Sequence, residues 1–419
     1  MGKKLLFITS RLLWPVDGGR KMSLNYYCKG LHEIYGYDVY LFSFLEKGQS
    51  FDGKLPDYIK EVRLADEIPA SVKVQNILTK SLVGKKWPFQ CSLFYSGQNA
   101  KAIREYADEI SPDVIITEMI RTAPYLDCLK KRPSVCIANL DDLLSKRYRR
   151  QIKSNNSKAN VAGAYAGKMP EWMNRIIENK AAKNWMLGLE ADRCEVWEKK
   201  FYDEYDYSMF TSPIEANELN KQMKQKKALT LSVGIDYDLF ARDIPGLEKI
   251  PNSLSYMGNF KVAANSDTLR MICEEILPLL KSDYKFYIIG SCPENIRNEY
   301  KGNDRIIFTG RIEDLAKNIR KTMIFLSPIS YGTGIKTKIV EAMAMGMPVI
   351  TNDVGAEGIA AENGKQYIVE NDYKKIAEAV DALLADSNIQ QKIGKEAQKF
   401  AYQYFRWEVI WKSFELAGL

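Results

Sequence analysis

Short apolar runs that alternate with longer helical periods are the feature that most constrains the fold of this chain. Strands that alternate with amphipathic helices are typical of parallel sheets covered by helices. Helical periods are clear at 268–281, 337–346, 373–386 and 388–403. We expect strands at 4–9, 37–44, 113–117, 134–140, 206–211, 254–257, 284–290, 305–309, 323–327, 347–351 and 366–369.

The length of the chain indicates two domains, because 419 residues exceed one ordinary hydrophobic core. Residues 232–252 are rich in Asp, Gly and Pro and have no long period, so they mark a linker. We therefore predict an α/β fold with two doubly wound Rossmann-like domains, at 1–240 and 241–403. A C-terminal helix at 404–419 is expected to pack back on the first domain. Ligands of such sheets bind at the carboxyl ends of the strands, so facing domains would share a cleft.

The composition indicates a globular protein of a reducing compartment. Hydrophobic residues make up 46% and charged residues 27%, and no apolar run approaches the roughly 20 residues of a membrane span. The seven cysteines include no C-x-x-C pair, and no His, Cys and carboxylate cluster has metal-ligand spacing. We expect a cytoplasmic protein without a disulfide framework, a zinc site or another metal.

The charge is uneven along the chain. Residues 1–200 hold 33 Lys and Arg against 23 Asp and Glu, whereas residues 201–419 hold 27 against 30. A basic front half favours an anionic partner, either a phosphate-bearing substrate or the surface of an anionic membrane. The alternative is a solvated surface without a partner.

The first stretch with chemical character is WPVDGGRK at 14–21, which follows the first strand and opens a helix. Gly18 and Gly19 permit a tight turn and a close approach of a ligand to the backbone. Free N–H groups of the helix behind them can bind an anion. The sequence contains no G-x-G-x-x-G, which argues against a dinucleotide oxidoreductase. A plain strand-to-helix turn is the alternative.

The second stretch is YGTGIKTKIVEAMAMGMPVI at 331–350. Its glycines precede a helix whose first turn carries Lys336 and Lys338, with Glu341 on the face of Lys338. Lysine in a first turn opposes the helix dipole, a cost that a bound diphosphate would offset. Glu341 could then accept hydrogen bonds from sugar hydroxyls. Alone, a Gly-rich turn before a helix is equally consistent with a structural turn.

Neighbouring segments add a resemblance to a known family. The run KTKIVEAMAMGMPVITNDVGAEGI resembles the donor-site signature of bacterial family-4-type glycosyltransferases of the GT-B fold. Segments such as SYMGNFKVAANSDTL and FTGRIEDLAKNIRKTMIFLSPI are similar to that family in order and spacing, so the resemblance covers 229–405. The first half is less similar. There NLDDLLSKRYRR resembles a subgroup of capsule and exopolysaccharide transferases with an Asp, a Ser and an aromatic residue.

The resemblance implies roles for individual residues. Glu341 would hold the nucleotide ribose, and the backbone from Gly334 would face the diphosphate. Gly18 and Gly19 would approach the diphosphate and the acceptor from the first domain. The remaining donor-binding candidates are Gly258 and Asn259 in the loop that usually carries phosphate-binding cations, Thr333, Ile335, Lys336 and Lys338 around the second Gly-rich turn, and Gly355, Ala356 and Glu357 near the sugar.

Three positions depart from the family pattern. Most relatives have a second glutamate eight residues before Glu341, where this chain has Thr333. The usual arginine and lysine of the loop after Gly258 are Asn259 and Asn265. Lys336 or Lys338 would then replace the missing cations.

Residues of the first domain must handle the acceptor. Relatives often place a histidine there, but the single histidine, His32, lies at the end of a helix and is expected to be structural. Polar residues after the strands at 113–117 and 134–140 would act instead. The candidate catalytic residues are Asp142 first, then Glu118 and Arg147, with Arg121 and Ser145 nearby.

The resemblance thus implies a retaining, metal-independent glycosyltransferase of the hexosyltransferase type, active in surface polysaccharide biosynthesis. Its donor would be a nucleotide-diphosphate sugar, with no further cofactor. Its acceptor would be a glycan, expected to be lipid-linked, with peripheral membrane contact through the basic half and no nucleic acid. Two alternatives remain: a catalytically silent GT-B subunit, motivated by Thr333 and the missing cations, and a sugar-nucleotide epimerase.

Overall fold

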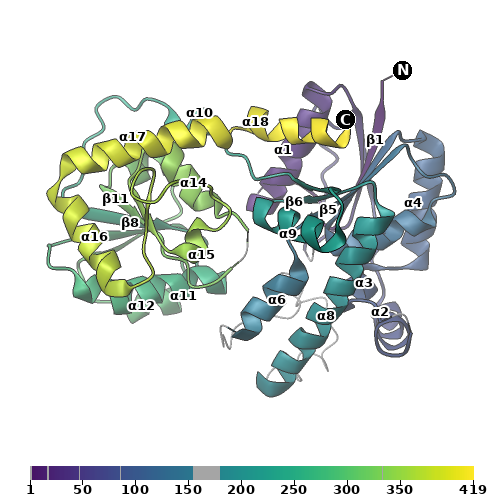
Figure 1. The fold of residues 1–419 in the computed structure, drawn as a ribbon, viewed down its shortest axis with the longest axis horizontal. Helices are drawn as coiled ribbons and strands as arrows, with labels where there is room; N and C mark the ends of the chain where they lie inside the picture. The colour runs from purple at the N-terminus through teal and green to yellow at the C-terminus, as the bar shows by residue number, and fades with distance from the viewer. Residues whose placement is uncertain (1, 17, 47, 85, 154–179, 333) are drawn as a thin grey trace. The chain divides into compact units, whose positions relative to one another are not determined.

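The computed structural model describes residues 2–16, 18–46, 48–84, 86–153, 180–332 and 334–419. The chain forms two compact units. Unit 1 comprises Met1–Ser232 and Trp411–Leu419, and unit 2 comprises Val233–Ile410. Figure 1 shows helices on both faces of the sheet in each unit.

The described residues of unit 1 form a parallel sheet in the order β3-β2-β1-β4-β5-β6-β7. Its central strands are almost continuously buried, as expected where helices cover both faces. The strands are β1 (Lys4–Thr9), β2 (Asp38–Ser43), β3 (Glu61–Leu64), β4 (Val114–Glu118), β5 (Val135–Asp141), β6 (Tyr207–Phe210) and β7 (Ala228–Thr230). The helical segments are α1 (Gly19–Glu33), α2 (Ala70–Asn76), η1 (Ile77–Val83), α3 (Phe89–Phe94), α4 (Gly97–Ile110), α5 (Met119–Thr122), η2 (Ala123–Cys128), α6 (Leu144–Lys153), α8 (Lys180–Glu204) and α9 (Pro213–Met223).

The described residues of unit 2 form a parallel sheet in the order β10-β9-β8-β11-β12-β13. Two hydrophobic clusters lie on its two faces, because alternate residues of its strands point to opposite sides. The strands are β8 (Ser253–Met257), β9 (Lys285–Ile289), β10 (Ile306–Gly310), β11 (Ile324–Leu326), β12 (Val349–Thr351) and β13 (Ile368–Val369). The helical segments are α10 (Tyr237–Ala241), α11 (Ala263–Met271), η4 (Ile272–Ile276), η5 (Leu277–Leu279), α12 (Glu294–Glu299), α13 (Leu315–Arg320), α14 (Thr337–Ala344), α15 (Asp353–Ala356), α16 (Tyr373–Ala385) and α17 (Ser387–Tyr404).

The end of the chain belongs to unit 1. It follows α18 (Trp407–Trp411) and forms η6 (Lys412–Ala417). The indole of Trp411 donates a hydrogen bond of 2.8 Å to the carbonyl of Tyr26. Gly30 of α1 lies directly under this ring, and a Cβ there would approach the ring to 2.5 Å. The close contact fastens the C-terminal segment to α1.

The observed boundaries differ from those expected at 240 and 403. Residues 233–240 belong to unit 2 because the Ile235 amide bonds to the Phe405 carbonyl at 2.8 Å and Phe240 enters the core of that unit. The chain leaves unit 2 after Ile410 and returns to unit 1 at Trp411. Asp236 caps α10 by accepting a hydrogen bond from the amide of Leu239 at 3.1 Å.

All eleven predicted strands are present, and two further strands escaped prediction. The missed strands, β3 and β7, lie at the two edges of the unit 1 sheet, where half-buried and short segments carry little apolar signal. The helix expected at 268–281 is divided among α11, η4 and η5. Among the described residues, no helix combines the length and the apolar character that crossing a bilayer requires.

Both sheets have a topological switch point, where neighbouring strands connect in opposite directions. In unit 1 it lies between β1 and β4, and in unit 2 between β8 and β11. Loops at the carboxyl ends of such strands diverge and leave room for a ligand. Both Gly-rich stretches predicted from the sequence follow a strand of these pairs, the first after β1 and the second after β11.

Candidate active site

Glycines line the carboxyl edge of the unit 2 sheet. Gly258 follows β8, Gly290 follows β9 and Gly310 ends β10. Gly290 has φ +127°, and a Cβ there would lie 2.0 Å from the carbonyl oxygen of Gly258. The Gly290 amide donates to the carbonyl of Gly310 at 3.0 Å. Only glycine permits this approach, and the edge therefore presents backbone with few side chains.

The Gly-rich turn after β11 is anchored before it reaches α14. The Ser330 amide donates to the Thr268 hydroxyl at 3.1 Å, and the Tyr331 hydroxyl donates to the Asp267 carboxylate at 3.1 Å. Gly334 has φ +69°, a left-handed conformation that favours glycine. Thr333 lies outside the described residues. The turn brings the uncapped N-terminus of α14 to the switch point of the sheet.

Lys338, in the first turn of α14, extends its ammonium group toward the loop after β8. Its ammonium group donates to the amide oxygen of Asn265 at 2.6 Å and to the hydroxyl of Tyr256 at 3.2 Å. It also lies 4.7 Å from the centre of the Tyr256 ring. Burial lowers the pKa of Lys338 to about 8, although nearby Glu341 opposes that shift. A partly desolvated ammonium of this kind interacts strongly with an incoming anion.

The glycine that opens the loop after β8 lies close to this ammonium. A Cβ on Gly258 would lie 3.2 Å from the Lys338 nitrogen and 3.1 Å from the side chain of Asn265. The side chain of Asn265 also donates to the carbonyl of Asn259 at 2.9 Å, and the Asn259 side chain accepts from the amide of Lys261 at 3.1 Å. The two asparagines that stand where the family has cations thus shape the loop and position Lys338.

Lys336 has a different place. Its ammonium donates to the carbonyl of Gly334 at 2.5 Å, within its own turn. Ile335, between these two residues, packs against the hydrophobic cluster beneath α14. Two lysines were proposed to replace the missing cations. The side chain of Lys338 reaches the glycines at the carboxyl edge of the sheet, whereas that of Lys336 stabilises its own turn.

Glu341 lies one turn further along α14, on the face of Lys338. Burial raises the pKa of its carboxyl to about 7, and the charge of Lys338 opposes that shift. The side chain is partly exposed, and no described residue donates a hydrogen bond to its carboxylate. A half-buried acceptor of this kind can receive hydrogen bonds from a ligand.

The segment after β12 is held by Asn352. Its side-chain oxygen accepts from the amides of Ile329 and Gly355, at 2.9 and 3.0 Å. A Cβ on Gly355 would lie 1.9 Å from the Thr351 hydroxyl, so this glycine is required for packing. Ala356 and Glu357, which follow, are partly exposed. A role of this segment beside the sugar stays a prediction.

In unit 1, Glu118 is a buried anchor at the end of β4. Its side chain is fully buried and accepts from the Ser10 amide at 2.8 Å and from Arg20 at 3.1 Å. Burial opposes ionisation, but Arg11, Arg20 and Arg121 hold the pKa of this carboxyl at about 2. The pairing places the arginine of α1 at the switch point, and the carboxylate itself has no access to a substrate.

Two adjacent aspartates end β5, and they differ in exposure. Asp142, our first catalytic candidate, is buried with 3% of its side chain exposed and is paired with Arg147, another candidate. Asp141 keeps 20% of its side chain exposed and accepts from Arg20 at 2.8 Å. Burial raises the pKa of Asp141, Arg20 opposes that shift, and Asp142 adds to it. Asp141 is the accessible carboxylate of the pair.

The backbone is locally distorted at the ends of β4 and β5. The register of β5 against β6 shifts between Asn139 and Asp141, and Asp141 has φ +71°. Met119, directly after β4, has φ +63°. A left-handed residue or a bulge reverses the alternation of side chains, which sequence reading assumes to be regular. Such backbone strain in non-glycine residues is concentrated at functional sites.

The remaining candidates of unit 1 have defined places. Gly18 precedes α1 in an extended conformation with open space around its Cα, and Gly19 begins the helix. Arg121 is buried with its guanidinium over the ring of Phe94. Ser145 donates from its amide and its hydroxyl to Glu198, at 3.0 and 2.6 Å. His32 bonds through Nδ1 to the carbonyl of Tyr37 at 2.9 Å, the structural place expected for it.

Comparison with known proteins places this geometry in a class. Residues 251–386 match the family described as Glycosyl transferases group 1. An uncharacterized 44.6 kDa protein in the cps region of Klebsiella pneumoniae is 24% identical over 320 residues, which cover 66% of this chain and 77% of that protein. The capsular polysaccharide biosynthesis glycosyltransferase CapM of Staphylococcus aureus is 25% identical over 198 residues, which cover 44% of this chain and 52% of CapM.

Solved structures share the fold along the whole chain. A sucrose-phosphate synthase from Thermosynechococcus elongatus aligns with a TM-score of 0.68 and 18% identity, covering 99% of this chain and 98% of that one. HepE of Anabaena, solved with UDP and glucose, aligns with a TM-score of 0.61 and 14% identity, covering 100% of both. The predicted pair of Rossmann-like domains of the GT-B type is confirmed. The residues that match the Glycosyl transferases group 1 family lie within unit 2.

Proposed function

We propose that this protein is a glycosyltransferase that moves a sugar from a nucleotide-diphosphate sugar to a hydroxyl of a glycan in capsule or related polysaccharide biosynthesis. The observation that carries the proposal is the arrangement of Lys338 and Glu341 on one face of α14. An ammonium beside bare glycine backbone at a helix N-terminus fits a diphosphate. A carboxylate without a hydrogen-bond donor, one turn away, fits the ribose hydroxyls.

The reaction asks this site to stabilise a leaving group. The bond between the anomeric carbon and the diphosphate oxygen breaks, and the electron pair leaves with the diphosphate. The acceptor oxygen bonds to the anomeric carbon, and its proton passes to the departing diphosphate. Lys338 and the N–H groups of α14 would stabilise the charge that develops on the diphosphate, which is commonly the largest catalytic contribution. This chemistry needs no metal, and we propose a metal-independent enzyme.

On the acceptor side, we propose that Asp141 contacts the incoming hydroxyl. Its exposed carboxylate, held by Arg20, can accept the hydroxyl hydrogen bond and orient the oxygen. Asp142 and Arg147 would support the shape of this edge, and Glu118 would hold Arg20. Retention of the anomeric configuration and a lipid-linked acceptor are proposed from the resemblance to family-4-type transferases. Contact of the basic front half with a membrane surface belongs to the same proposal.

The names and titles of relatives support the substrate class. CapM is a capsular polysaccharide glycosyltransferase, and a HepE structure contains UDP-glucose. We therefore propose a nucleotide sugar as donor, with uridine diphosphate sugars tested first. The name of CapM refers to capsular polysaccharide biosynthesis, and the Klebsiella relative is described as a protein in the cps region, which supports a growing polysaccharide as the proposed acceptor class.

Thermal stability with nucleoside diphosphates and their sugars, in the presence of EDTA, tests donor binding. A ligand at a hundred times its dissociation constant adds about 2.7 kcal/mol and raises the melting temperature visibly. We expect one nucleotide family to stabilise the protein without metal. Transfer to a polysaccharide fragment would then give a product whose anomeric proton coupling reports retention. No stabilisation by any nucleotide would contradict the proposal and favour a silent subunit, and an epimer formed without acceptor would indicate an isomerase.

A further inference from the structure

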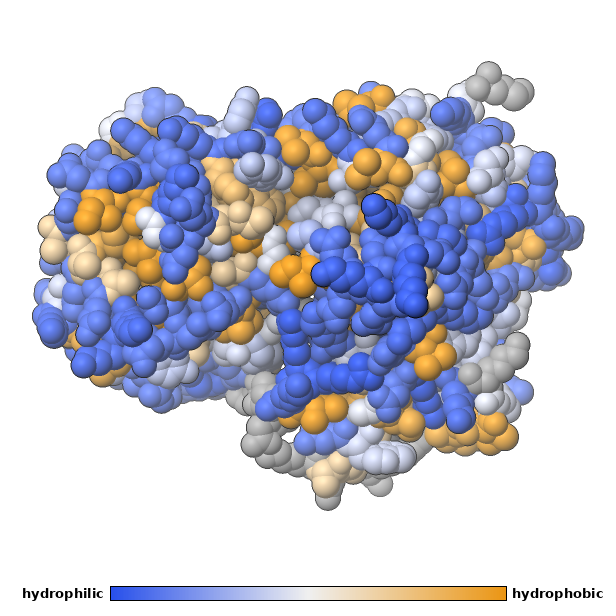
Figure 2. Space-filling model, in the orientation of Figure 1, coloured by the Kyte–Doolittle hydropathy of each residue, from blue (hydrophilic) through white to orange (hydrophobic). Residues whose placement is uncertain are grey.

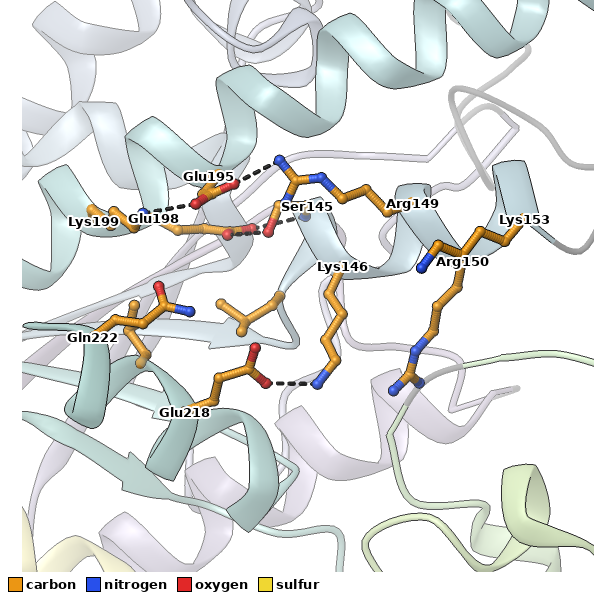
Figure 3. Close-up of a pocket in the computed structure, with 12 residues that line it drawn as sticks. Ser145, Lys146, Arg149, Arg150, Lys153, Glu195, Glu198, Lys199, Glu218 and Gln222 are labelled. Carbon is orange, nitrogen blue, oxygen red and sulfur yellow. Dashed lines mark hydrogen bonds and ion pairs between the residues drawn. The ribbon is translucent and has the colours of Figure 1, made fainter.

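A polar cavity of unit 1 lies between α6, α8 and α9, with a volume of about 290 Å³. Figure 3 shows side chains from these three helices pointing into the same space. In Figure 2 the molecular face over α6 and α9 is strongly hydrophilic. The roles proposed above for the donor and for Asp141 do not use this cavity.

Cations outnumber carboxylates around the cavity. Five lysines and arginines line it against three glutamates. Two of these cations are ion-paired: Arg149 contacts Glu195 at 2.6 Å and also Asp192 at 3.0 Å, and Lys146 contacts Glu218 at 2.7 Å. Lys199 shares Glu195 with Arg149, at 2.7 Å. The carboxylates thus neutralise part of the positive charge and fix the lysine and arginine side chains in place.

The third carboxylate carries only part of its negative charge near neutral pH. Glu198 is 3% exposed and accepts two hydrogen bonds from Ser145 at the first turn of α6. Burial raises the pKa of Glu198 to about 7, although these hydrogen bonds oppose the shift. Arg150 and Lys153 add positive charge at the C-terminal end of α6, and Lys153 makes no ion pair with any residue that the structure describes. The cavity therefore has a net positive charge.

We propose that this cavity is an anion-binding subsite for a phosphate or diphosphate group of the acceptor. Its volume lies at the lower end of the roughly 300–1,000 Å³ of small-molecule sites, which suits a phosphate-bearing headgroup better than a whole nucleotide sugar. Lysine and arginine side chains held at fixed positions bind phosphate oxygens through charge-assisted hydrogen bonds.

The biological role of this subsite rests on the proposed function. Helix α6 connects the cavity to Asp141, the residue proposed to contact the acceptor. This helix begins three residues after Asp141, and its Arg147 pairs with Asp142. An anion seated on α6 would hold the acceptor by a group remote from the reacting hydroxyl. Such remote binding energy can position a substrate at the reacting centre. A lipid-linked glycan and a soluble sugar phosphate would offer the same phosphate chemistry.

Phosphorus NMR titration with inorganic pyrophosphate tests the subsite, with UDP at saturation to occupy the donor site. The test variant is Arg150→Gln with Lys153→Gln, and Lys153→Gln alone serves as the milder form, because this side chain is exposed. Lys374→Gln with Lys375→Gln, on the exposed side of α16, makes the same change in net charge and is the matched control. We expect wild type and control to bind pyrophosphate equally, and the double variant to bind about tenfold or more weakly.

Equal binding by all three proteins, or no binding by wild type, would overturn the subsite. The same titration in Lys338→Gln shows whether pyrophosphate binds independently of the donor site. If no nucleoside diphosphate binds, the proposed function fails, and the comparison between the double variant and its control still decides the cavity. Geranyl diphosphate distinguishes the sources: binding tighter than that of pyrophosphate identifies a lipid-linked acceptor, and equal binding identifies a soluble one.

Discussion

The ammonium nitrogen of Lys338 lies 2.6 Å from the amide oxygen of Asn265, a residue 73 positions earlier in the chain. Asn265 stands where relatives of the family-4 type have a lysine. The positive charge is therefore present near the loop after β8, but it comes from α14 instead of from α11. Through this contact, a chain without the usual cations would provide the diphosphate site that we propose.

Removing this ammonium should weaken donor binding. We expect Lys338→Gln to lower the affinity for the preferred nucleoside diphosphate about tenfold to a hundredfold, since a charge-assisted hydrogen bond contributes about 1.5–3 kcal/mol. Titration calorimetry measures the change. Lys285→Gln, exposed at the opposite edge of the same sheet, is the control and should bind as wild type does. Unchanged affinity in Lys338→Gln would remove this lysine from the donor site.

Glu341 should recognise the ribose. We expect Glu341→Ala to weaken nucleotide binding about tenfold to a hundredfold, because the hydroxyls lose a charged acceptor. The 2′-deoxy form of the same nucleotide should lose much less, since it makes fewer of these hydrogen bonds. Glu378→Ala, on the exposed face of α16, provides the control. Equal losses for the ribose and deoxyribose ligands would contradict the assignment.

Substitution of the two adjacent aspartates should have different effects, on the transfer rate for Asp141 and on stability for Asp142. We expect Asp141→Asn to keep donor affinity and to reduce transfer by about two orders of magnitude or more, the typical contribution of a positioned acid or base. Asp142→Asn should instead lower the melting temperature, because it leaves Arg147 without its buried partner. Initial rates and thermal melts of both variants distinguish the roles. A fully active Asp141→Asn would return the choice to Asp142.

Donor affinity should depend on pH in a narrow range. Above about pH 8 Lys338 loses its proton and its attraction for the diphosphate. Below about pH 7 Glu341 gains a proton and becomes a poorer acceptor for the ribose hydroxyls. We expect the affinity to be highest between these values. Binding measured from pH 6 to 9.5 should lose its alkaline limb in Lys338→Gln and its acidic limb in Glu341→Gln, and a variant that keeps both limbs would disprove the titration assigned to it.

Glu118 should contribute acid-sensitive stability. Its pKa is about 2 in the folded protein against an ordinary 4.5, a difference that corresponds to about 3 kcal/mol at neutral pH. Because the folded pKa is lowered, this contribution is present above pH 4.5 and is lost as the pH falls from 4.5 to 2. Glu118→Gln should be less stable than wild type at pH 7, and the difference should shrink in acid. Urea unfolding from pH 7 to 3 measures it, and a constant difference would count against the assignment.

The amino-acid sequence by itself determined the elements and much of the donor region. Strand runs and helical periods depend on the spacing of neighbouring residues, and so the eleven predicted strands could be read directly. The same holds for the glycines before α14 and for Lys338 and Glu341, which helical geometry places on one face. The edge strands β3 and β7 were missed because strands at an edge bury less and need less apolar character.

Only the tertiary structure decided which side chains meet. Asp141 is partly exposed beside a register shift whereas Asp142 is buried, and no local pattern records this difference. The contact of Lys338 with Asn265 and the place of residues 233–240 in unit 2 join segments far apart in the chain. The cavity beside α6 likewise exists because three helices pack together. Local periodicity carries secondary structure, whereas contacts between distant residues arise only when the sheets and helices assemble.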